Sequence, residues 1–358
     1  MHRSPICLED DIPFGKKSRT KNAIGCSLYW VKVVYGGIIV FSVLNLFTLL
    51  MLMEQPNLHG NAVKVTVGMC IKNSEGLVKK AVGSLLVQDF PHQLMELVIV
   101  DGNSKDRTLE ILKESLTKTD IRVRIFSEKS GLGMARQMVV DRANGDYIVW
   151  VDADMILPRS YIFRLVTFMD GNPAIGIAGG RYAARIGQGV AADLENIVYA
   201  VDSLDGERGS KFGYLPGTEG SIFRVAAIRQ IGGFDVRMNG AAEDTEIAFR
   251  MNQSGWGIVR LEEMFAESTR PSWSSLWDQY VWYGRGGHFI FHKNSNAINL
   301  WKMTPTAGFL AGSLRSPKAY LLTHRAIVFL LPLHYAFKRV AWYFGFVRAH
   351  FDGYGHFT

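Results

Sequence analysis

Short apolar strands that alternate with helical segments fill the chain from residue 63 to residue 151. The expected strands are Val63–Gly68, Glu96–Val100, Ile121–Phe126 and Tyr147–Val151, and helical spacing of apolar residues lies between them at 74–88, 106–118 and 132–143. Connections of this length join parallel strands through right-handed crossovers. The sequence therefore predicts an α/β fold built on a Rossmann-like, mostly parallel sheet flanked by helices.

The second half of the chain is less regular, and turns and helical spacing indicate its elements. We expect a strand at 174–179, a glycine-rich turn and strand at 213–223, a tight turn at 232–234, and helices at 243–252 and 275–291. Gly255 follows the first of these helices, where a glycine C-cap is expected. With 48% hydrophobic and 20% charged residues, the chain can bury a large core and is too apolar to be disordered.

One segment near the N-terminus predicts a transmembrane helix. Val33 to Met53 contains no charged residue, and at about 1.5 Å per residue it would span roughly 30 Å, the thickness of a bilayer core. A buried core helix is the alternative. We expect a polar tail at residues 1–30, the transmembrane helix at 31–54, the main domain at 62–270, and acceptor-side, membrane-associated helices at 271–358.

Positive charge is concentrated in the last of these segments. Residues 271–358 contain nine Lys or Arg and two Asp or Glu, in a chain whose formal net charge is +7. Within them the apolar stretch Ala319–Val347 is interrupted by charged residues and by Pro332, which is typical of helices lying in a membrane interface. A basic end suits an anionic partner such as phosphate groups or a membrane surface. Because no nucleic-acid motif accompanies the basic and aromatic residues, we expect no nucleic-acid partner.

Polar side chains follow three strands of the predicted sheet. Asn73 and Glu75 follow the first strand, Asp101 and Asn103 the second, and Asp152 and Asp154 the fourth. In an open parallel sheet, ligands bind beyond the carboxyl ends of the strands. Single polar turns arise by chance, but several acidic strand ends on one rim predict a binding site there.

Asp152-Ala-Asp154 is the most specific of these features. Residues i and i+2 that leave a strand end can both reach one divalent cation, and Mg²⁺ or Mn²⁺ prefers carboxylate, water and phosphate oxygens. Such an ion would neutralise a diphosphate leaving group. An isolated Asp-x-Asp is usually a solvated turn, but its position directly after a buried strand favours a metal site.

Asp101 and Arg136 are candidates for nucleotide and phosphate contacts. A carboxylate offers only acceptors, so Asp101 could bind a nucleobase or ribose; the alternative is a helix cap, a role that Asp106 fits better. Arg136 lies on the third predicted helix and could pair with phosphate or with Asp152, or could simply be a surface residue.

Two further groups are candidate site residues. Glu243 and Asp244 begin a helix, and because neighbouring helical residues diverge by about 100°, we expect one to be a general base and the other to orient it or a neighbour. Stabilisation of the helix dipole is the alternative. Gln279, Trp282 and Arg285 could clamp a diphosphate and a sugar ring, or belong to an aromatic interfacial helix.

Taken together, these motifs resemble the family 2 glycosyltransferases, which have the GT-A fold. The matching motifs, in family order, are Lys72-Asn73-Ser74-Glu75, Val-Asp-Gly-Asn-Ser-x-Asp-x-Thr from Val100, Ala135-Arg136, Asp152-Ala-Asp154, Gly232-Gly233-Phe234 and Glu243-Asp244. The segment 275–287 is similar to the Tyr-Gly-Arg-Gly region of membrane-bound members that build exopolysaccharide or lipid-linked glycans. It departs from the Gln-x-x-Arg-Trp motif of processive synthases, since Trp282 precedes Arg285.

The resemblance implies an inverting, metal-dependent glycosyltransferase. By this resemblance Asp101 would bind the nucleotide base, Asp152 the nucleotide portion and Asp154 the Mn²⁺ or Mg²⁺, while Asp244 would deprotonate the acceptor hydroxyl. The implied partners are a UDP- or GDP-linked sugar and a polyprenyl-phosphate-linked or other lipid or glycan acceptor. The alternatives are a nucleotidyltransferase of similar topology and a catalytically inactive scaffold that binds glycan or lipid.

The compartment is inferred from two conflicting observations. Positive charge before the predicted span would export the catalytic domain. Against this, nucleotide sugars are made in the cytosol, and the scattered cysteines Cys7, Cys26 and Cys70 form no disulfide framework. We expect a single-pass anchor with the catalytic domain on the cytoplasmic side.

Overall fold

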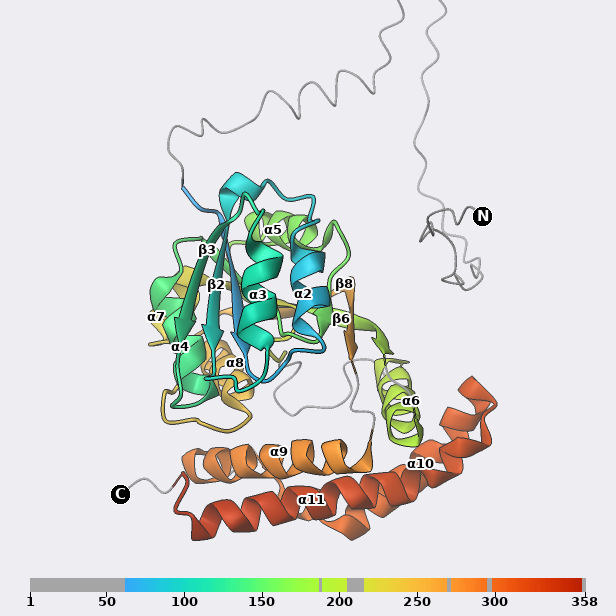
Figure 1. Ribbon diagram of the computed structural model, residues 1–358. Helices are drawn as coiled ribbons and strands as arrows, with labels where there is room; N and C mark the ends of the chain where they lie inside the picture. The colour runs from blue at the N-terminus through green and yellow to red at the C-terminus, as the bar shows by residue number, and fades with distance from the viewer. Residues whose placement is uncertain (1–61, 187–188, 205–215, 269–271, 295–297, 356–358) are drawn as a thin grey trace, which may run out of the picture. The chain divides into compact units, whose positions relative to one another are not determined.

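Four parallel strands form the first half of the sheet in the computed structural model, which describes residues 62–186, 189–204, 216–268, 272–294 and 298–355 (Figure 1). The strands are β1 (Val65–Ile71), β2 (Met95–Asp101), β3 (Arg122–Ser127) and β4 (Tyr147–Trp150), joined by α2 (Val78–Leu85), η1 (His92–Leu94), α3 (Thr108–Leu116) and α4 (Leu132–Arg142). In the register, Val65 of β1 pairs with Met95 of β2 and with Tyr147 of β4. The predicted alternation of strands and helices is confirmed here.

The second half of the sheet is mixed. Its strands are β5 (Met155–Ile156), β6 (Ile175–Ile186), β7 (Ser221–Arg224) and β8 (Gly257–Ser268), and the sheet order is β3-β2-β1-β4-β7-β6-β8-β5. Strand β7 is antiparallel to both β4 and β6, whereas β6 and β8 are parallel. The sequence prediction missed β8, because charged residues at 260, 262 and 263 break its apolar pattern.

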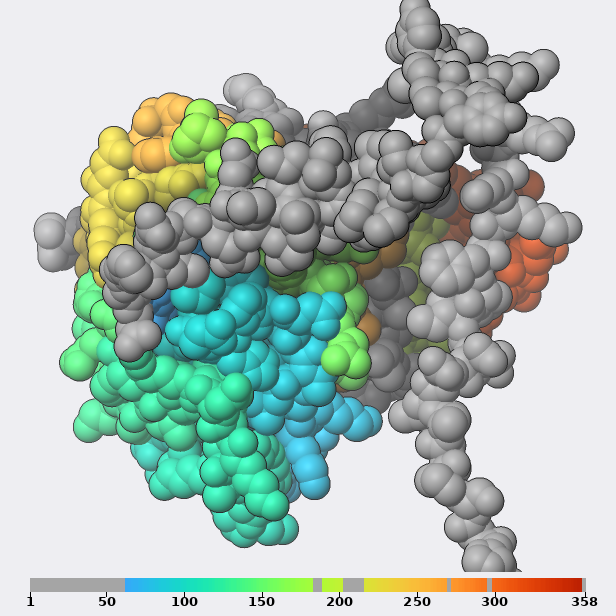
Figure 2. Space-filling view, turned by 90° about the horizontal axis from the view of Figure 1, so that it is seen from above, coloured from blue at the N-terminus to red at the C-terminus, as the bar shows by residue number. Residues whose placement is uncertain are grey.

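Helices cover both faces of the sheet, and alternate residues of the strands supply the two apolar clusters. Leu97 and Ile99 of β2 pack with α2, α3 and α5 (Tyr161–Gly171) on one face. Val98 and Val100 pack with α4, α7 (Val225–Gln230) and α8 (Glu243–Gln253) on the other. This alternation follows from the two-residue period of a strand. In Figure 2 the residues of β1 to α4, in blue to green, gather on one side, and red C-terminal residues emerge on the other.

The C-terminal segment is helical. It comprises α9 (Trp273–Lys293), η3 (Leu300–Met303), α10 (Pro305–Thr323), η4 (Ala326–Leu330) and α11 (Leu331–Phe351), and α6 (Val190–Leu204) packs against it through Leu194 and Val201. Helices α9 and α11 run side by side along the lower edge of the domain (Figure 1). They touch through backbone, since a Cβ at Gly284 would lie 1.9 Å from the Trp342 carbonyl oxygen.

Large apolar side chains remain exposed on these helices. Trp301, Leu314 and Phe351 each have more than four-fifths of their surface accessible, and Leu321 is 72% exposed. Monomeric soluble proteins rarely expose large side chains in such number on one segment. The segment therefore has a surface suited to an apolar partner.

The expected single-pass membrane anchor is not supported by the structure. In the described part of the chain, no helix is both long and apolar enough to cross a membrane. The predicted span itself, Val33 to Met53, lies outside the described residues, as does the rest of residues 1–61.

Candidate active site

A cavity of about 750 Å³ lies at the carboxyl ends of β1 and β4, the place that the sheet topology favours for ligands. Its wall is completed by the start of α8 and by one face of α9. Of the predicted site residues, those that line it are Asn73, Arg136, Asp152, Asp154, Glu243, Asp244, Gln279 and Trp282. Segments up to about 200 positions apart in the sequence thus supply one cavity.

Asp152 and Asp154 leave the end of β4 toward this cavity, while Val151 and Ala153 are buried. The backbone carbonyl of Asp154 accepts a hydrogen bond from the N–H of Ser268 at 3.0 Å, which ties this turn to the end of β8. Burial raises the pKa of Asp152; the positive charge of Arg136 opposes the rise, and the negative charge of Asp244 adds to it. The two carboxylates therefore lie where a cation would be stabilised.

Arg136 is buried and paired with acids from two directions. Its Nη2 lies 3.8 Å from Asp152 Oδ1, and its Nη1 donates to Glu243 Oε1. The guanidinium lies over the Trp150 ring at 5.8 Å. Burial opposes its charge, but the pKa of Arg136 is raised overall because Glu243, Asp152 and then Asp244 are close. The sequence left two places for Arg136, a pair with an acid or phosphate and a surface position; the structure shows the pair with Asp152 and a buried side chain.

Glu243 and Asp244 diverge at the start of α8, as the helical angle predicts. Glu243 is 1% exposed and pairs with Arg136, and among the described residues no group hydrogen-bonds to its Oε2. Burial raises its pKa to about 8, against the effect of Arg136. Asp244 is partly exposed in the cavity, and its Oδ1 accepts the Thr245 N–H at 2.6 Å. Ala242, just before them, has a left-handed φ of 75°.

Glu219 is a cavity residue that the sequence reasoning missed. Its Oε1 accepts a hydrogen bond from the Tyr182 hydroxyl at 2.9 Å. Burial, followed by the charge of Asp244, raises the pKa of Glu219 to about 7. The signal in the sequence is an acid inside the glycine-rich turn before β7, where Gly220 has a φ of 64°.

Three predicted residues shape the rim instead of lining the cavity. Asp101 is 4% exposed and accepts the Ser104 N–H at 3.1 Å and the Ser104 hydroxyl at 2.6 Å. Glu75 accepts the Arg107 N–H at 2.9 Å, and Asn103 accepts from Lys105 Nζ at 3.3 Å. Asp101 thus holds the turn after β2, whose Gly102 does line the cavity.

The candidates on α9 divide into two groups. Gln279 and Trp282 line the cavity, and Gln279 Nε2 donates to the Tyr283 hydroxyl at 3.0 Å. Arg285 is not among the cavity residues of the described structure: it pairs with Asp352 at 2.8 Å and lies over the Tyr354 ring at 4.5 Å. Arg285 therefore stabilises the packing of α9 on the end of α11.

Comparison with known proteins identifies a family for the first part of the sheet domain. Residues 66–228 match the family model described as "Glycosyl transferase family 2". The match covers β1 to α7 and ends before Glu243.

Two curated relatives are similar over about three quarters of this chain. A "Probable glycosyltransferase YdaM" of Bacillus subtilis (strain 168) is 25% identical over 285 residues, which are 75% of this chain and 66% of that protein. A "Poly-beta-1,6-N-acetyl-D-glucosamine synthase" of Staphylococcus epidermidis is 23% identical over 274 residues, 74% of this chain and 63% of that protein. The chain thus spans slightly less than two thirds of the length of these relatives.

A solved structure shares the fold. The mannosyltransferase PcManGT from Pyrobaculum calidifontis, in complex with GDP-Man and Mn²⁺, superposes with a TM-score of 0.56 at 17% identity, over 86% of this chain and 94% of that one. The likeness identifies the α/β sheet and its flanking helices as GT-A-like, as the motifs implied.

Proposed function

Since residues 66–228 match the family model of the family 2 glycosyltransferases, we propose that this chain is a glycosyltransferase that moves one sugar, with inversion, from a UDP- or GDP-linked donor to a lipid-linked or other glycan acceptor. The observation that carries the proposal is one cavity that brings together Asp152, Asp154, Arg136 and Asp244. Direct displacement needs a base behind the acceptor oxygen and positive charge beside the leaving diphosphate, and these residue types supply both.

The donor side of the cavity suits a divalent cation, Mn²⁺ or Mg²⁺. Asp152 and Asp154 would hold it, since hard cations of this kind take a few carboxylates and fill the other positions with water and phosphate. The raised pKa of Asp152 supports this fit, because burial and the charge of Asp244 outweigh Arg136 there. When bound, the ion neutralises the charge that develops on the diphosphate. The solved mannosyltransferase of the same fold contains Mn²⁺.

Arg136 and Glu243 would position this group. With Glu243 on one side and Asp152 at 3.8 Å on the other, the guanidinium holds the Asp152 carboxylate at the end of β4. Asn73 and the turn fixed by Asp101 and Asn103 would contact the nucleotide. The cost of burying Arg136 is offset by its two acidic partners.

Asp244 would be the general base. It accepts the proton of the acceptor hydroxyl as that oxygen bonds to the anomeric carbon, and the bond from this carbon to the diphosphate breaks with its electron pair leaving on the nucleotide. Gln279 and Trp282 on α9 would hold the acceptor at the opposite wall. The exposed apolar side chains of α10 and α11 favour an acceptor with a lipid portion, because contact with lipid removes these side chains from water and lowers the free energy.

Transfer and donor hydrolysis with a panel of UDP- and GDP-sugars test the proposal. Asp244→Asn keeps the shape of the side chain and removes its basicity, so turnover should fall by about 10²–10⁴ while donor affinity changes little. Asp154→Ala should lose metal-dependent donor binding. Asp89→Asn, at an exposed position paired with Arg159, is the matched control and should keep wild-type turnover.

Two outcomes contradict the assignment. If Glu243→Gln is inactive and Asp244→Asn is near normal, Glu243 is the base. If Asp154→Ala transfers sugar at the wild-type rate in EDTA, the cation has no role at Asp154.

A further inference from the structure

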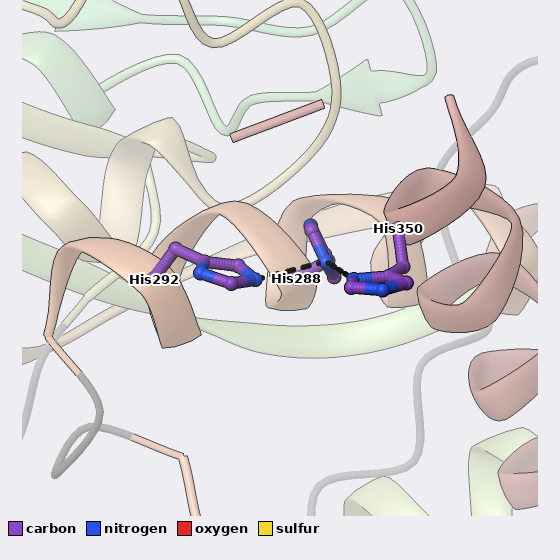
Figure 3. Close-up of side chains that lie close together, drawn as sticks. All are labelled: His288, His292 and His350. Carbon is purple, nitrogen blue, oxygen red and sulfur yellow. Dashed lines mark hydrogen bonds between the residues drawn. The ribbon is translucent and has the colours of Figure 1, made fainter. Parts of the chain in front are cut away.

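Three histidines converge outside the cavity, where α9 packs on the end of α11. His288 and His292 are one helical turn apart on α9, and His350 lies in the last turn of α11 (Figure 3). One ring nitrogen of each lies within 4.8 Å of the other two. In the described part of the chain this is the only group of three or more His, Cys, Asp or Glu side chains with ligand atoms this close.

The central ring is fixed in one tautomer. His288 Nδ1 lies 2.6 Å from the backbone carbonyl oxygen of Tyr354. Because a carbonyl oxygen only accepts, Nδ1 carries the proton, and the Nε2 of the neutral ring keeps its lone pair. His288 is fully buried and packs edge-on against Phe346. This pattern, with one nitrogen bonded to a carbonyl and the other turned to the ligand, is how proteins orient metal-binding histidines.

The spacing of the nitrogens fits a tetrahedral ion. With Zn–N bonds of about 2.0–2.1 Å, two nitrogens of a tetrahedral site are roughly 3.3 Å apart. His288 Nε2 lies 3.1 Å from His292 Nε2 and 3.4 Å from His350 Nδ1. Figure 3 shows the His288 ring between the other two. The third pair of nitrogens, on His292 and His350, lies within 4.8 Å, and both side chains are exposed. Binding one ion would require these two side chains to rotate toward each other.

We propose that His288, His292 and His350 bind one zinc ion, with water as the fourth ligand, at a site separate from the catalytic one. Imidazole nitrogens select Zn²⁺ and similar transition metals over Mg²⁺ and Mn²⁺, which prefer oxygen. The ion bonds α9 to the end of α11. It does so beside Tyr354, whose hydroxyl accepts the Gly240 N–H at 3.0 Å in the segment that leads to Glu243 and Asp244.

Equilibrium dialysis of the untagged full chain against Zn²⁺, followed by elemental analysis, tests the site. We expect one tightly held equivalent in the wild type and in Asp154→Ala. His292→Ala and His350→Ala remove exposed ligands without opening the core, and each should weaken binding by at least about tenfold. His92→Ala is the matched control, because His92 is bonded to Asp120 in another part of the domain, and it should bind like the wild type.

Two further measurements separate a metal site from a cluster held by hydrogen bonds. Co²⁺ in place of Zn²⁺ should give the strong visible absorption of a tetrahedral complex, and His350→Ala should abolish it. Zn²⁺ should also raise the unfolding midpoint of the wild type and not that of His292→Ala. The proposal is overturned if the wild type holds no zinc, or if the two histidine variants bind it as the wild type does.

Discussion

Replacing Gly284 with alanine tests the packing of α9 on α11. A Cβ at this position would lie 1.9 Å from the carbonyl oxygen of Trp342 and 2.8 Å from its carbonyl carbon, whereas real Cβ contacts are essentially never below 3.0 Å. The helices must therefore separate by about 1 Å or more at this point, since a packed interior has no free space to absorb the methyl group. Because the opposing atoms are backbone, no change of rotamer relieves the overlap.

The expected cost follows from this geometry. Overpacking by one carbon typically destabilises a core by about 1–3 kcal/mol, and two rigid backbones place Gly284→Ala at or above the upper end, about 3 kcal/mol. Equilibrium unfolding in urea measures this cost as a lower midpoint with an unchanged slope. We also expect lower transfer activity, because Gln279 and Trp282 lie on the same helix.

A glycine in open space is the matched control. Gly83 lies exposed in α2, and a Cβ there meets no atom within 4 Å. Gly83→Ala should therefore stabilise the protein by up to about 1 kcal/mol, through helix propensity alone. If Gly284→Ala is as stable as Gly83→Ala, the close contact of α9 and α11 does not exist in solution and the reasoning fails.

Three further predictions concern single side chains. Burial opposes the charge of Glu195, but hydrogen bonds from His334 and the charge of Lys338 lower its pKa from 4.5 to about 2. As the pH falls, the unfolded chain therefore takes up the proton before the folded chain does. About 3 kcal/mol of the free energy of unfolding should be lost between pH 4.5 and pH 2. Unfolding titrations should show a flatter pH dependence for Glu195→Gln, and equal slopes would refute the pairing. Burial raises the pKa of the Cys70 thiol to about 12. In a variant whose other two cysteines are serine, alkylation at pH 8 should therefore be at least about a hundredfold slower than that of a free thiol. Reaction at the free-thiol rate would show an ionised Cys70. Ala242→Gly should raise the free energy of unfolding by up to about 1 kcal/mol, because glycine adopts the left-handed φ without steric cost, and a loss of stability in urea would contradict this.

The sequence predicted the first half of the fold because local pattern and topology agree there. The strands near Val65, Met95 and Tyr147 are short, apolar and separated by helical spacing, so their order and direction follow from general rules. Strand β8 is different: Arg260 and Glu262 interrupt its apolar pattern, and pairing with β6 and β5 creates it. Such strands depend on tertiary contacts that a window of sequence does not contain.

The same contrast holds for the site. The rule that ligands lie beyond strand ends selected Asp152 and Asp154, which line the cavity, and Asp101, whose carboxylate accepts hydrogen bonds from Ser104 three residues on. Such a short-range turn depends on where the Ser104 side chain lies, which the position of Asp101 after a strand does not reveal. Glu219 was missed because its turn enters the site from an antiparallel strand, outside the βαβ pattern.

The histidine cluster shows a third limit. The spacing of His288 and His292 by four residues is visible in the sequence. The third member, His350, arrives only through the packing of α11 on α9. Spacing along one helix therefore indicates two of the three histidines, and the third depends on which helices pack against each other.

The cavity wall on α9 has a consequence for how this protein can diversify. The family match ends at residue 228, so it includes the strand-end carboxylates Asp152 and Asp154 but not α9. Gln279 and Trp282 reach the cavity from a helix that meets the loop before α8 through glycine, since a Cβ at Gly286 would lie 2.0 Å from the Ala241 carbonyl oxygen. Side chains on the cavity face of α9 can therefore be exchanged while that backbone contact stays the same. On the proposed assignment, the acceptor wall can therefore change while the donor carboxylates stay the same, and redesign of acceptor specificity begins at positions 279 and 282.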